Sequence, residues 1–288
     1  MKKVLLLAEE HFGDAIKGFI GDRYEVSHLT NREWKSKAFL SKMKSIITSD
    51  YIHHFGGTES KTLINTCALL SKKLIIQFTG TDVYNILRKD SKRQQEIRKL
   101  YSKVWRLAAV SENLAAELRA VSIENVEVVS FAVKFDMPRE LNITPENSAL
   151  SYIPEGNEDF YGWEQVKELI MQFPDVQFYI LANSGIMGFR ADNVQFTGWV
   201  EKPEEYISKV KVYLRHTKHD GLPNMVMQSL LHGRQVLYNG KFPYCRDFTK
   251  GQFRQCIENW EPNIEGQRYI IGNFSRDKIV EGYIKLYD

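Results

Sequence analysis

The sequence predicts an α/β protein with mainly parallel sheets, because short apolar runs alternate with amphipathic helical stretches along the chain. A polar segment over 136–147 interrupts this alternation, which then restarts, so we interpret it as a linker between two open α/β domains. The chain has 288 residues, of which 43% are hydrophobic and 26% charged, and this is enough for two domains with ordinary cores.

Each apolar run bounded by turn residues is predicted to be a strand. In the first half, the predicted strands are 4–8, 24–29, 45–53, 74–79, 106–111 and 126–131. In the second half, they are 149–153, 177–182, 194–197, 210–215 and 235–238. The predicted helices are 58–70, 91–103, 112–121, 163–172, 203–209, 224–232, 248–259 and 276–287.

Residues 216–238 carry the strongest local pattern: strand end, tight turn, helix, short turn and next strand. Asp220 and Gly221 form the turn, Pro223 stands at the first helical position, and Gly233 ends the helix. This leaves a helix N-terminus open at the carboxyl end of a strand, where α/β proteins hold phosphates. No capping residue directly precedes Pro223, so a ligand anion is a candidate partner for the first N–H groups.

Charge and composition point away from several classes of protein. The net charge of +3 is too small to imply nucleic acid, and no apolar run reaches the ~18 residues of a membrane span. The basic stretch over 89–103 is interpreted as a solvated helix face, with weak peripheral contact to anionic lipid as the alternative. Three cysteines without metal spacing, and an N-terminus that starts directly with a strand, predict a cytoplasmic protein.

Four fragments, in order along the chain, resemble one family. They are Gly80-Thr81-Asp82-Val83; Val110-Ser111-Glu112 with the strand after it and Asp136; Phe196-Thr197-Gly198-Trp199-Val200; and Asp220-Gly221-Leu222-Pro223 with Gln228 and Gly233. Their order and spacing resemble the retaining GT-B glycosyltransferases of the family 4, or group 1, type, which include sucrose synthase and the phosphatidylinositol mannosyltransferases.

The resemblance implies a GT-B fold of two Rossmann-like domains with a cleft between them. Residues 1–140 would form the acceptor side and 141–272 the nucleotide-sugar-binding domain, and a helix in 273–288 would pack back on the first domain. The implied activity moves a sugar from a UDP-, GDP- or dTDP-linked donor to an acceptor hydroxyl, with retention of configuration. No D-x-D, P-loop or G-x-G-x-x-G motif occurs at the relevant positions, so neither a metal nor a cofactor is expected.

Site residues are carried over from the family motifs by position. Asp220 would be the catalytic residue and orient the donor sugar, and Gln228 would hold the ribose. The remaining donor-binding candidates are Trp199 and Val200 near the base, and Lys218, Gly221, Leu222 and Asn224 around the diphosphate. From the residues alone, Asp220 is also a turn former, Gln228 a polar flank of an apolar stripe, and Lys218 a solvated loop cation.

The sequence departs from the family pattern in three places. The family's two glutamates are replaced by Asp220 and Gln228, the latter without charge. The stretch 154–163 holds three acids where the family offers an Arg and a Lys to the diphosphate.

The third departure lies in the first domain, where Thr79 replaces the family's histidine. Thr79 itself is a candidate cleft residue, and one of His53 and His54 could approach the cleft in place of that histidine. Gly13 follows the first strand, where the family often has a glycine-rich loop near the acceptor, and is a further candidate. Strand alternation places the two histidines on opposite faces, so only one of them can serve. Asp82 is interpreted as a helix cap rather than a catalytic group.

Two other functions remain open at this point. The missing cations and the change from Glu to Gln favour a GT-B-shaped binding or scaffold subunit without catalysis. A sugar-nucleotide epimerase of related architecture is the other alternative. The sequence does not identify the base, the sugar, the acceptor or the oligomeric state.

Overall fold

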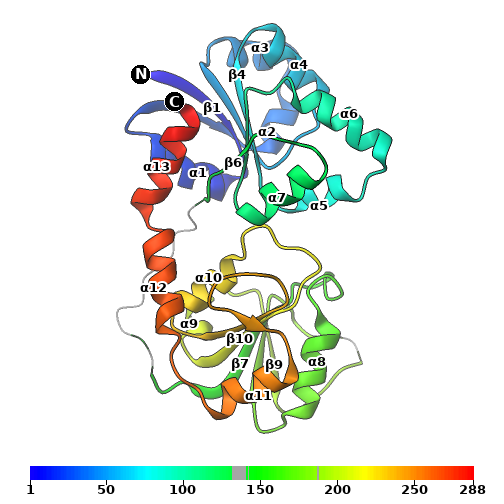
Figure 1. Cartoon of the computed structure of the whole chain (residues 1–288), viewed down its shortest axis with the longest axis vertical. Helices are drawn as coiled ribbons and strands as arrows, with labels where there is room; N and C mark the ends of the chain where they lie inside the picture. The colour runs from blue at the N-terminus through cyan, green and yellow to red at the C-terminus, as the bar shows by residue number, and fades with distance from the viewer. Residues whose placement is uncertain (132–140, 142, 187) are drawn as a thin grey trace. The chain divides into compact units, whose positions relative to one another are not determined.

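The computed structural model describes residues 1–131, 141, 143–186 and 188–288 (Figure 1). Its contacts divide the chain into two compact units, unit 1 with Met1–Lys134 and Phe274–Asp288, and unit 2 with Phe135–Asn273. Asp136 lies outside the described residues, and the boundary predicted after residue 140 falls at their edge, so it stays a prediction. Glu146 and Asn147, the last two residues of the predicted linker, already belong to a strand.

Unit 1 is a six-stranded parallel sheet in the order β2-β1-β3-β4-β5-β6. Its strands are β1 (Lys2–Leu7), β2 (Tyr24–Leu29), β3 (Tyr51–Phe55), β4 (Lys73–Phe78), β5 (Arg106–Ala109) and β6 (Val126–Val128). Its helices are α1 (Glu10–Ile20), α2 (Asn31–Ser36), α3 (Phe39–Ile47), α4 (Lys61–Leu69), α5 (Thr81–Leu87), α6 (Ser91–Tyr101), α7 (Glu112–Ala120) and α13 (Arg276–Tyr287).

Unit 2 is a second six-stranded parallel sheet, in the order β12-β11-β10-β7-β8-β9. Its strands are β7 (Glu146–Tyr152), β8 (Gln177–Leu181), β9 (Val194–Gly198), β10 (Val210–Arg215), β11 (Gln235–Tyr238) and β12 (Arg246–Asp247). Its helices are α8 (Trp163–Gln172), α9 (Glu204–Ile207), α10 (Asn224–Leu231), α11 (Lys250–Glu258) and α12 (Ile264–Asn273).

The strand orders locate the natural binding position of each sheet. In unit 2 the chain builds outward from β7 to β9 and then returns to place β10 on the other side of β7. This is the doubly wound order, and its reversal lies between β7 and β10; in unit 1 the reversal lies between β1 and β3. Ligands of such sheets bind at the carboxyl ends of the strands beside the reversal.

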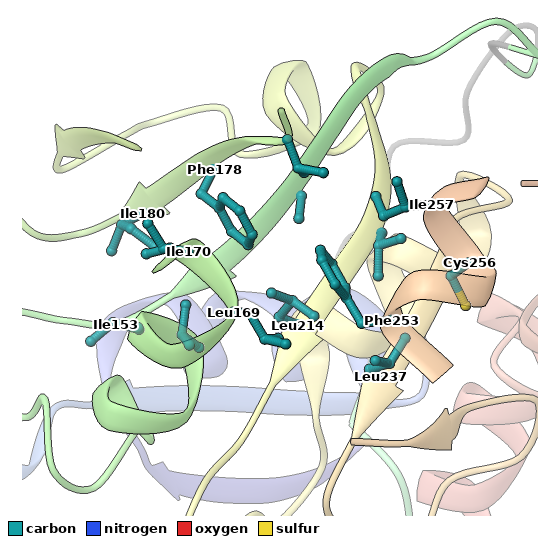
Figure 2. Packing of buried hydrophobic residues seen from close by; sticks show 14 of the residues in the cluster. Ile153, Leu169, Ile170, Phe178, Ile180, Leu214, Leu237, Phe253, Cys256 and Ile257 are labelled. Carbon is teal, nitrogen blue, oxygen red and sulfur yellow. The ribbon is translucent and has the colours of Figure 1, made fainter. Parts of the chain in front are cut away.

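The core of unit 2 shows how these elements are held in place. Phe178 of β8 and Phe253 of α11 are almost fully buried and stack with ring centroids 5.7 Å apart (Figure 2). Ile170 of α8 and Leu214 of β10 belong to the same cluster, so α8 and α11 cover one face of the sheet. Burial of such apolar side chains is the main favourable contribution to folding, and it fixes β7 and β10 as neighbours.

The C-terminal helix α13 belongs to unit 1. Tyr283 and Tyr287 of α13 are fully buried, and the Tyr287 hydroxyl lies 2.7 Å from Nδ1 of His53 on β3. Near the start of the helix, Arg276 donates to the Gly18 carbonyl of α1 at 2.9 Å. Residues 274–288 are therefore an integral part of the first core rather than an appendage.

Most predicted strands are present, but the one predicted over 45–53 is wrong at its start. Helix α3 runs to Ile47, and β3 begins only at Tyr51. Ile46 and Ile47 resemble a strand locally, yet Phe39, Met43 and Ile46 repeat at helical spacing, and Ile46 is buried as part of that helix. Helix α4 likewise begins at Lys61, three residues later than predicted, because the Ser60 hydroxyl caps it by accepting from the Leu63 N–H.

No helix among the described residues combines the length and the apolar character that a membrane span requires.

The buried histidine of β3 makes the stability of unit 1 sensitive to pH. Burial, with a smaller contribution from the neighbouring His54, lowers the pKa of His53 to about 3. In the unfolded chain a histidine titrates near pH ~6.5, so on acidification from pH 7 to 5 the unfolded state gains a proton that the folded state does not. The free energy of unfolding is therefore expected to fall by about 2 kcal/mol over this range on account of His53.

Thermal unfolding from pH 7 to 5 measures this dependence. We expect a shallower pH dependence in His53→Gln than in the wild type. The control His11→Gln, which changes an exposed histidine of α1, should keep the wild-type slope. Equal slopes in all three proteins would contradict a neutral, buried His53.

Candidate functional site

The carboxyl end of β10, beside the reversal of the unit 2 sheet, carries a buried ion pair. Nε and Nη2 of Arg215 lie 2.8 and 2.7 Å from the same oxygen, Oδ2, of Asp220. Their side chains are only 10% and 12% exposed. Asp220 is thus held at the strand end by the last residue of the strand itself.

Aromatic rings enclose this ion pair. The Arg215 guanidinium lies 4.7 Å from the ring centroid of Tyr161, within the range of a cation–π contact. Tyr238, at the end of the neighbouring strand β11, hydrogen-bonds Asp220; burial raises the pKa of Tyr238, and the Asp220 charge raises it further. Residues after β7, β10 and β11 therefore converge on one charged group.

The loops after β7 and β10 approach each other very closely. A Cβ atom on Gly162 would lie 2.5 Å from Nδ1 of His216, and Gly162 also has a φ of +65°. Only glycine meets both conditions without strain. The main chain adds a further link, because the Lys218 N–H donates to the Phe160 carbonyl at 3.0 Å.

The acids of the loop after β7 are engaged within unit 2. Glu158 accepts from the Gly156 N–H at 2.9 Å and from Nδ2 of Asn183 at 3.0 Å, and hydrogen bonds from the backbone lower the pKa of Glu158. Asp159 forms an ion pair with Lys218. Both members of this pair are well exposed, so it is worth little energy and can exchange partners.

The N-terminus of α10 is open, as the sequence predicts. The N–H groups of Met225 and Val226 have no acceptor among the residues that the structure describes. Oδ1 of Asn224 is buried and also lacks a partner within the described part of the chain. This end of the helix thus offers N–H donors and one carbonyl acceptor at the same edge as Asp220.

The other donor-side candidates occupy the same unit. Gly221 and Leu222 form the buried turn ahead of α10, and Gln228 is partly exposed on the helix one turn further on. Trp199 directly follows β9, and its side chain is 77% exposed. Val200, its neighbour, is partly buried. Their contact with a ligand remains a prediction.

In unit 1, the carboxylate of Asp82 accepts the N–H groups at the corresponding strand ends. Its carboxylate accepts the N–H groups of Thr79, Gly80 and Val83 at the start of α5, at 2.8–3.2 Å. It also accepts from the N–H of Gly57, in the loop after β3. Asp82 therefore joins two loops and fills the helix N-terminus, and this supports the structural interpretation of Asp82.

The candidate residues of the first domain have contacts that indicate structural roles. Gly13 lies within α1 rather than in a loop, and a Cβ there would lie 2.0 Å from the His28 ring, so the expected loop glycine is corrected to a packing glycine. His53 is fully buried against α13, where it bonds Tyr287 and has no access to solvent. Thr79 follows β4 and donates its N–H to Asp82.

Sequence reasoning missed Arg215. The family pattern has an Arg and a Lys directly after β7, whereas this chain has a buried arginine at the end of β10, across the reversal of the sheet. The sequence does indicate this residue, because Arg215 ends the apolar run 210–215 shortly before the turn at Asp220. A charged residue at the buried end of a strand needs a partner, and here the partner is Asp220.

A metal centre has no support among the described residues, because no three His, Cys, Asp or Glu side chains cluster there as ligands would.

The structure is similar to solved structures of glycosyltransferases. Anabaena HepE in complex with UDP matches with a TM-score of 0.73 and 10% identity, over 100% of this chain and 99% of that chain. Sucrose-phosphate synthase from Thermosynechococcus elongatus matches at 0.69 and 10% identity, over 100% and 98%. A glycosyltransferase from Rickettsia africae matches at 0.72 and 10% identity, over 99% and 97%.

These similarities confirm the predicted fold class, α/β of the GT-B type with two Rossmann-like sheets. No protein-family model matches the chain, and no curated protein matches it in sequence. At about a tenth identity the comparisons establish the fold and leave the chemistry to the residues of the site.

The Asp82 carboxylate is expected to be a main stabiliser of unit 1. Asp82→Ala leaves four backbone N–H groups without their acceptor, so we expect the free energy of unfolding to fall by about 2 kcal/mol or more. Asp90→Ala is the matched control, because Asp90 caps α6 through one N–H, that of Arg93, and a lost cap costs about 1 kcal/mol. Urea unfolding measures both, and equal losses would contradict the linking role.

Asp220 is expected to stabilise unit 2 as well as to serve the site. Asp220→Ala leaves the Arg215 charge buried without a partner, and we expect a loss of about 3 kcal/mol. Asp220→Asn keeps an acceptor oxygen and should lose less. The control Asp159→Ala removes an acid from an exposed ion pair and should leave urea unfolding almost unchanged. A stable Asp220→Ala variant would contradict the buried pairing.

Proposed function

We propose that this protein is a glycosyltransferase that moves a sugar from a nucleotide-diphosphate donor to an acceptor hydroxyl. The observation that carries the proposal is the buried Arg215–Asp220 pair beside the open N-terminus of α10, at the reversal of the unit 2 sheet. The GT-B fold supports it, since Anabaena HepE, of the same fold, has been crystallised with UDP and with UDP-glucose.

The diphosphate would bind at the N-terminus of α10. The Met225 and Val226 N–H groups suit phosphate oxygens, and the helix dipole favours a negative charge there. Arg215 holds a guanidinium at the same edge of the sheet, where its charge is shared with Asp220, and Lys218 can leave its exposed partner Asp159. These groups take over the role of the cations that are missing from the loop after β7.

The sugar and the nucleoside are assigned to the remaining candidates. Arg215 orients Asp220 through Oδ2, and the Asp220 carboxylate would accept a hydroxyl of the donor sugar. The unpartnered Oδ1 of Asn224 suits another hydroxyl, and Gln228 would accept from the ribose. The exposed Trp199 ring, with Val200 beside it, offers an apolar surface for the base.

In the proposed step, the bond between the anomeric carbon and the diphosphate oxygen breaks. The acceptor oxygen bonds to the same carbon on the same face, so the configuration is retained. The acceptor proton passes to the leaving diphosphate oxygen, whose negative charge the helix N–H groups and Arg215 stabilise. We propose that the reaction needs no metal ion or cofactor, and that the protein works in the cytoplasm on a UDP-, GDP- or dTDP-linked donor.

Titration calorimetry with UDP, GDP and dTDP tests donor binding, and product analysis tests transfer. We expect Arg215→Lys to weaken binding of the preferred nucleotide about tenfold, because lysine keeps the charge but loses the fork on Asp220. Asp220→Asn should bind the nucleotide nearly as well, yet turn over its sugar donor about a hundredfold more slowly. Arg254→Lys, an exposed change on α11, is the control and should match the wild type.

Three results would overturn the proposal. Absence of binding by every nucleotide would favour the GT-B-shaped scaffold subunit, which the three acids after β7 motivate. Conversion of the donor to an isomeric nucleotide sugar without an acceptor would indicate an epimerase instead. Equal nucleotide affinity in Arg215→Lys and Arg254→Lys would remove the diphosphate role of Arg215.

A further inference from the structure

A cavity of about 350 Å³ lies within unit 1, between α2, α3 and α4 and under the end of β3. Its volume falls in the range of ligand sites, which is about 300–1,000 Å³. Three kinds of side chain line it: apolar ones, ones with a hydroxyl or amide group, and lysines. The residues that matter below are Trp34, Lys35, Phe39, Lys42, His54 and Ser60.

The cavity carries positive charge without compensation. Lys35 and Lys42 both line it, and none of its lining residues is an acid. Within the described part of the chain neither lysine has a carboxylate partner, and Lys42 donates to the Lys35 carbonyl at 3.2 Å. The ammonium of Lys42 instead lies 5.8 Å from the centre of the Trp34 ring. An anionic group would therefore find two unpaired cations.

His54 adds a hydroxyl acceptor to the cavity. Its Nδ1 is hydrogen-bonded to the Gly56 carbonyl, so Nδ1 is the protonated nitrogen of a neutral ring and Nε2 carries the lone pair. Burial lowers the pKa of His54, and this keeps the ring neutral near pH 7. Among the described residues Nε2 has no hydrogen-bond partner, and it is not one of the fully buried unpartnered atoms, so it can accept an O–H from a ligand.

The hydroxyl groups of the cavity keep protons to donate. Thr58 Oγ1 accepts from the Ser60 N–H at 3.3 Å, and Ser60 Oγ accepts from the Leu63 N–H at 3.3 Å. Each hydroxyl can accept and donate at once, so both retain a donor for a ligand oxygen. The rings of Trp34 and Phe39 provide flat apolar surface beside these donors.

We propose that this cavity binds an acidic carbohydrate, a sugar unit that bears a carboxylate or a phosphate. The hydroxyls of the sugar meet His54 and the Ser and Thr side chains, its C–H face lies on Trp34 or Phe39, and its acidic group pairs with Lys35 and Lys42. This assignment rests on the proposed function, and it makes an acidic saccharide the acceptor of the transfer.

The test uses the full chain and small acidic sugars. Saturation-transfer NMR would compare glucuronate and glucose 6-phosphate with glucose, and would include octyl phosphate as an amphiphile. We expect the two acidic sugars to bind at least tenfold more tightly than glucose, because each charge-assisted hydrogen bond to a lysine adds to their affinity. In Lys35→Gln/Lys42→Gln, their affinity should fall to that of glucose.

The double variant Lys37→Gln/Lys44→Gln is the matched control, since both lysines stand on the same segment but neither lines the cavity. It should keep the wild-type affinity. Three results would each overturn the proposal: no preference for acidic sugars, equal losses in the two double variants, or binding of octyl phosphate alone. Calorimetry with UDP separates this result from the proposed function, because UDP affinity should be unchanged in Lys35→Gln/Lys42→Gln. If UDP fails to bind even the wild type while acidic sugars bind, the cavity assignment stands and the transferase proposal fails.

Discussion

The ion pair between Arg215 and Asp220 is the interaction on which the candidate site of unit 2 depends. Both charges are largely withdrawn from water, so each needs the other to offset its desolvation. Arg215 is fixed by the hydrogen bonds of β10, and it therefore fixes Asp220 and with it the turn that leads into α10. The same contact sets where the open N-terminus of α10 lies.

The two units share one sheet architecture but differ in what lies at the helix N-termini beside their strand ends. In unit 1, the N-terminus of α5 is filled by the chain's own Asp82, which accepts four backbone N–H groups. In unit 2, the Met225 and Val226 N–H groups at the start of α10 remain without an acceptor among the described residues. An internal carboxylate thus occupies the donors at the start of α5, whereas the donors at the start of α10 stay open in the unit that also carries Arg215.

Two of the acidic residues after β7 make structural contacts. Glu158 links the loops after β7 and β8, and Asp159 holds Lys218 in an exposed pair. Neither removes positive charge from Arg215, whose partner is Asp220. The cations that stand nearest to this loop, Arg215 and Lys218, are therefore each paired with an acid of unit 2. Unit 1 carries its own positive charge at Lys35 and Lys42, which line a cavity without an acidic residue among its lining.

The sequence by itself determined the α/β class, most strands and the position of the turn and helix at 220–233, because these follow from periodicity, Gly, Pro and local capping. It also separated His53 from His54 by face, and the structure confirms this, with His53 against Tyr287 and His54 lining the cavity. It could not separate helix from strand at Ile46 and Ile47, where packing decides. Only the tertiary structure paired Arg215 with Asp220, gave Asp82 its four donors and enclosed a cavity around Lys35 and Lys42. Strand order and loop packing bring these groups together across the sheet, and no local pattern in the chain encodes such contacts.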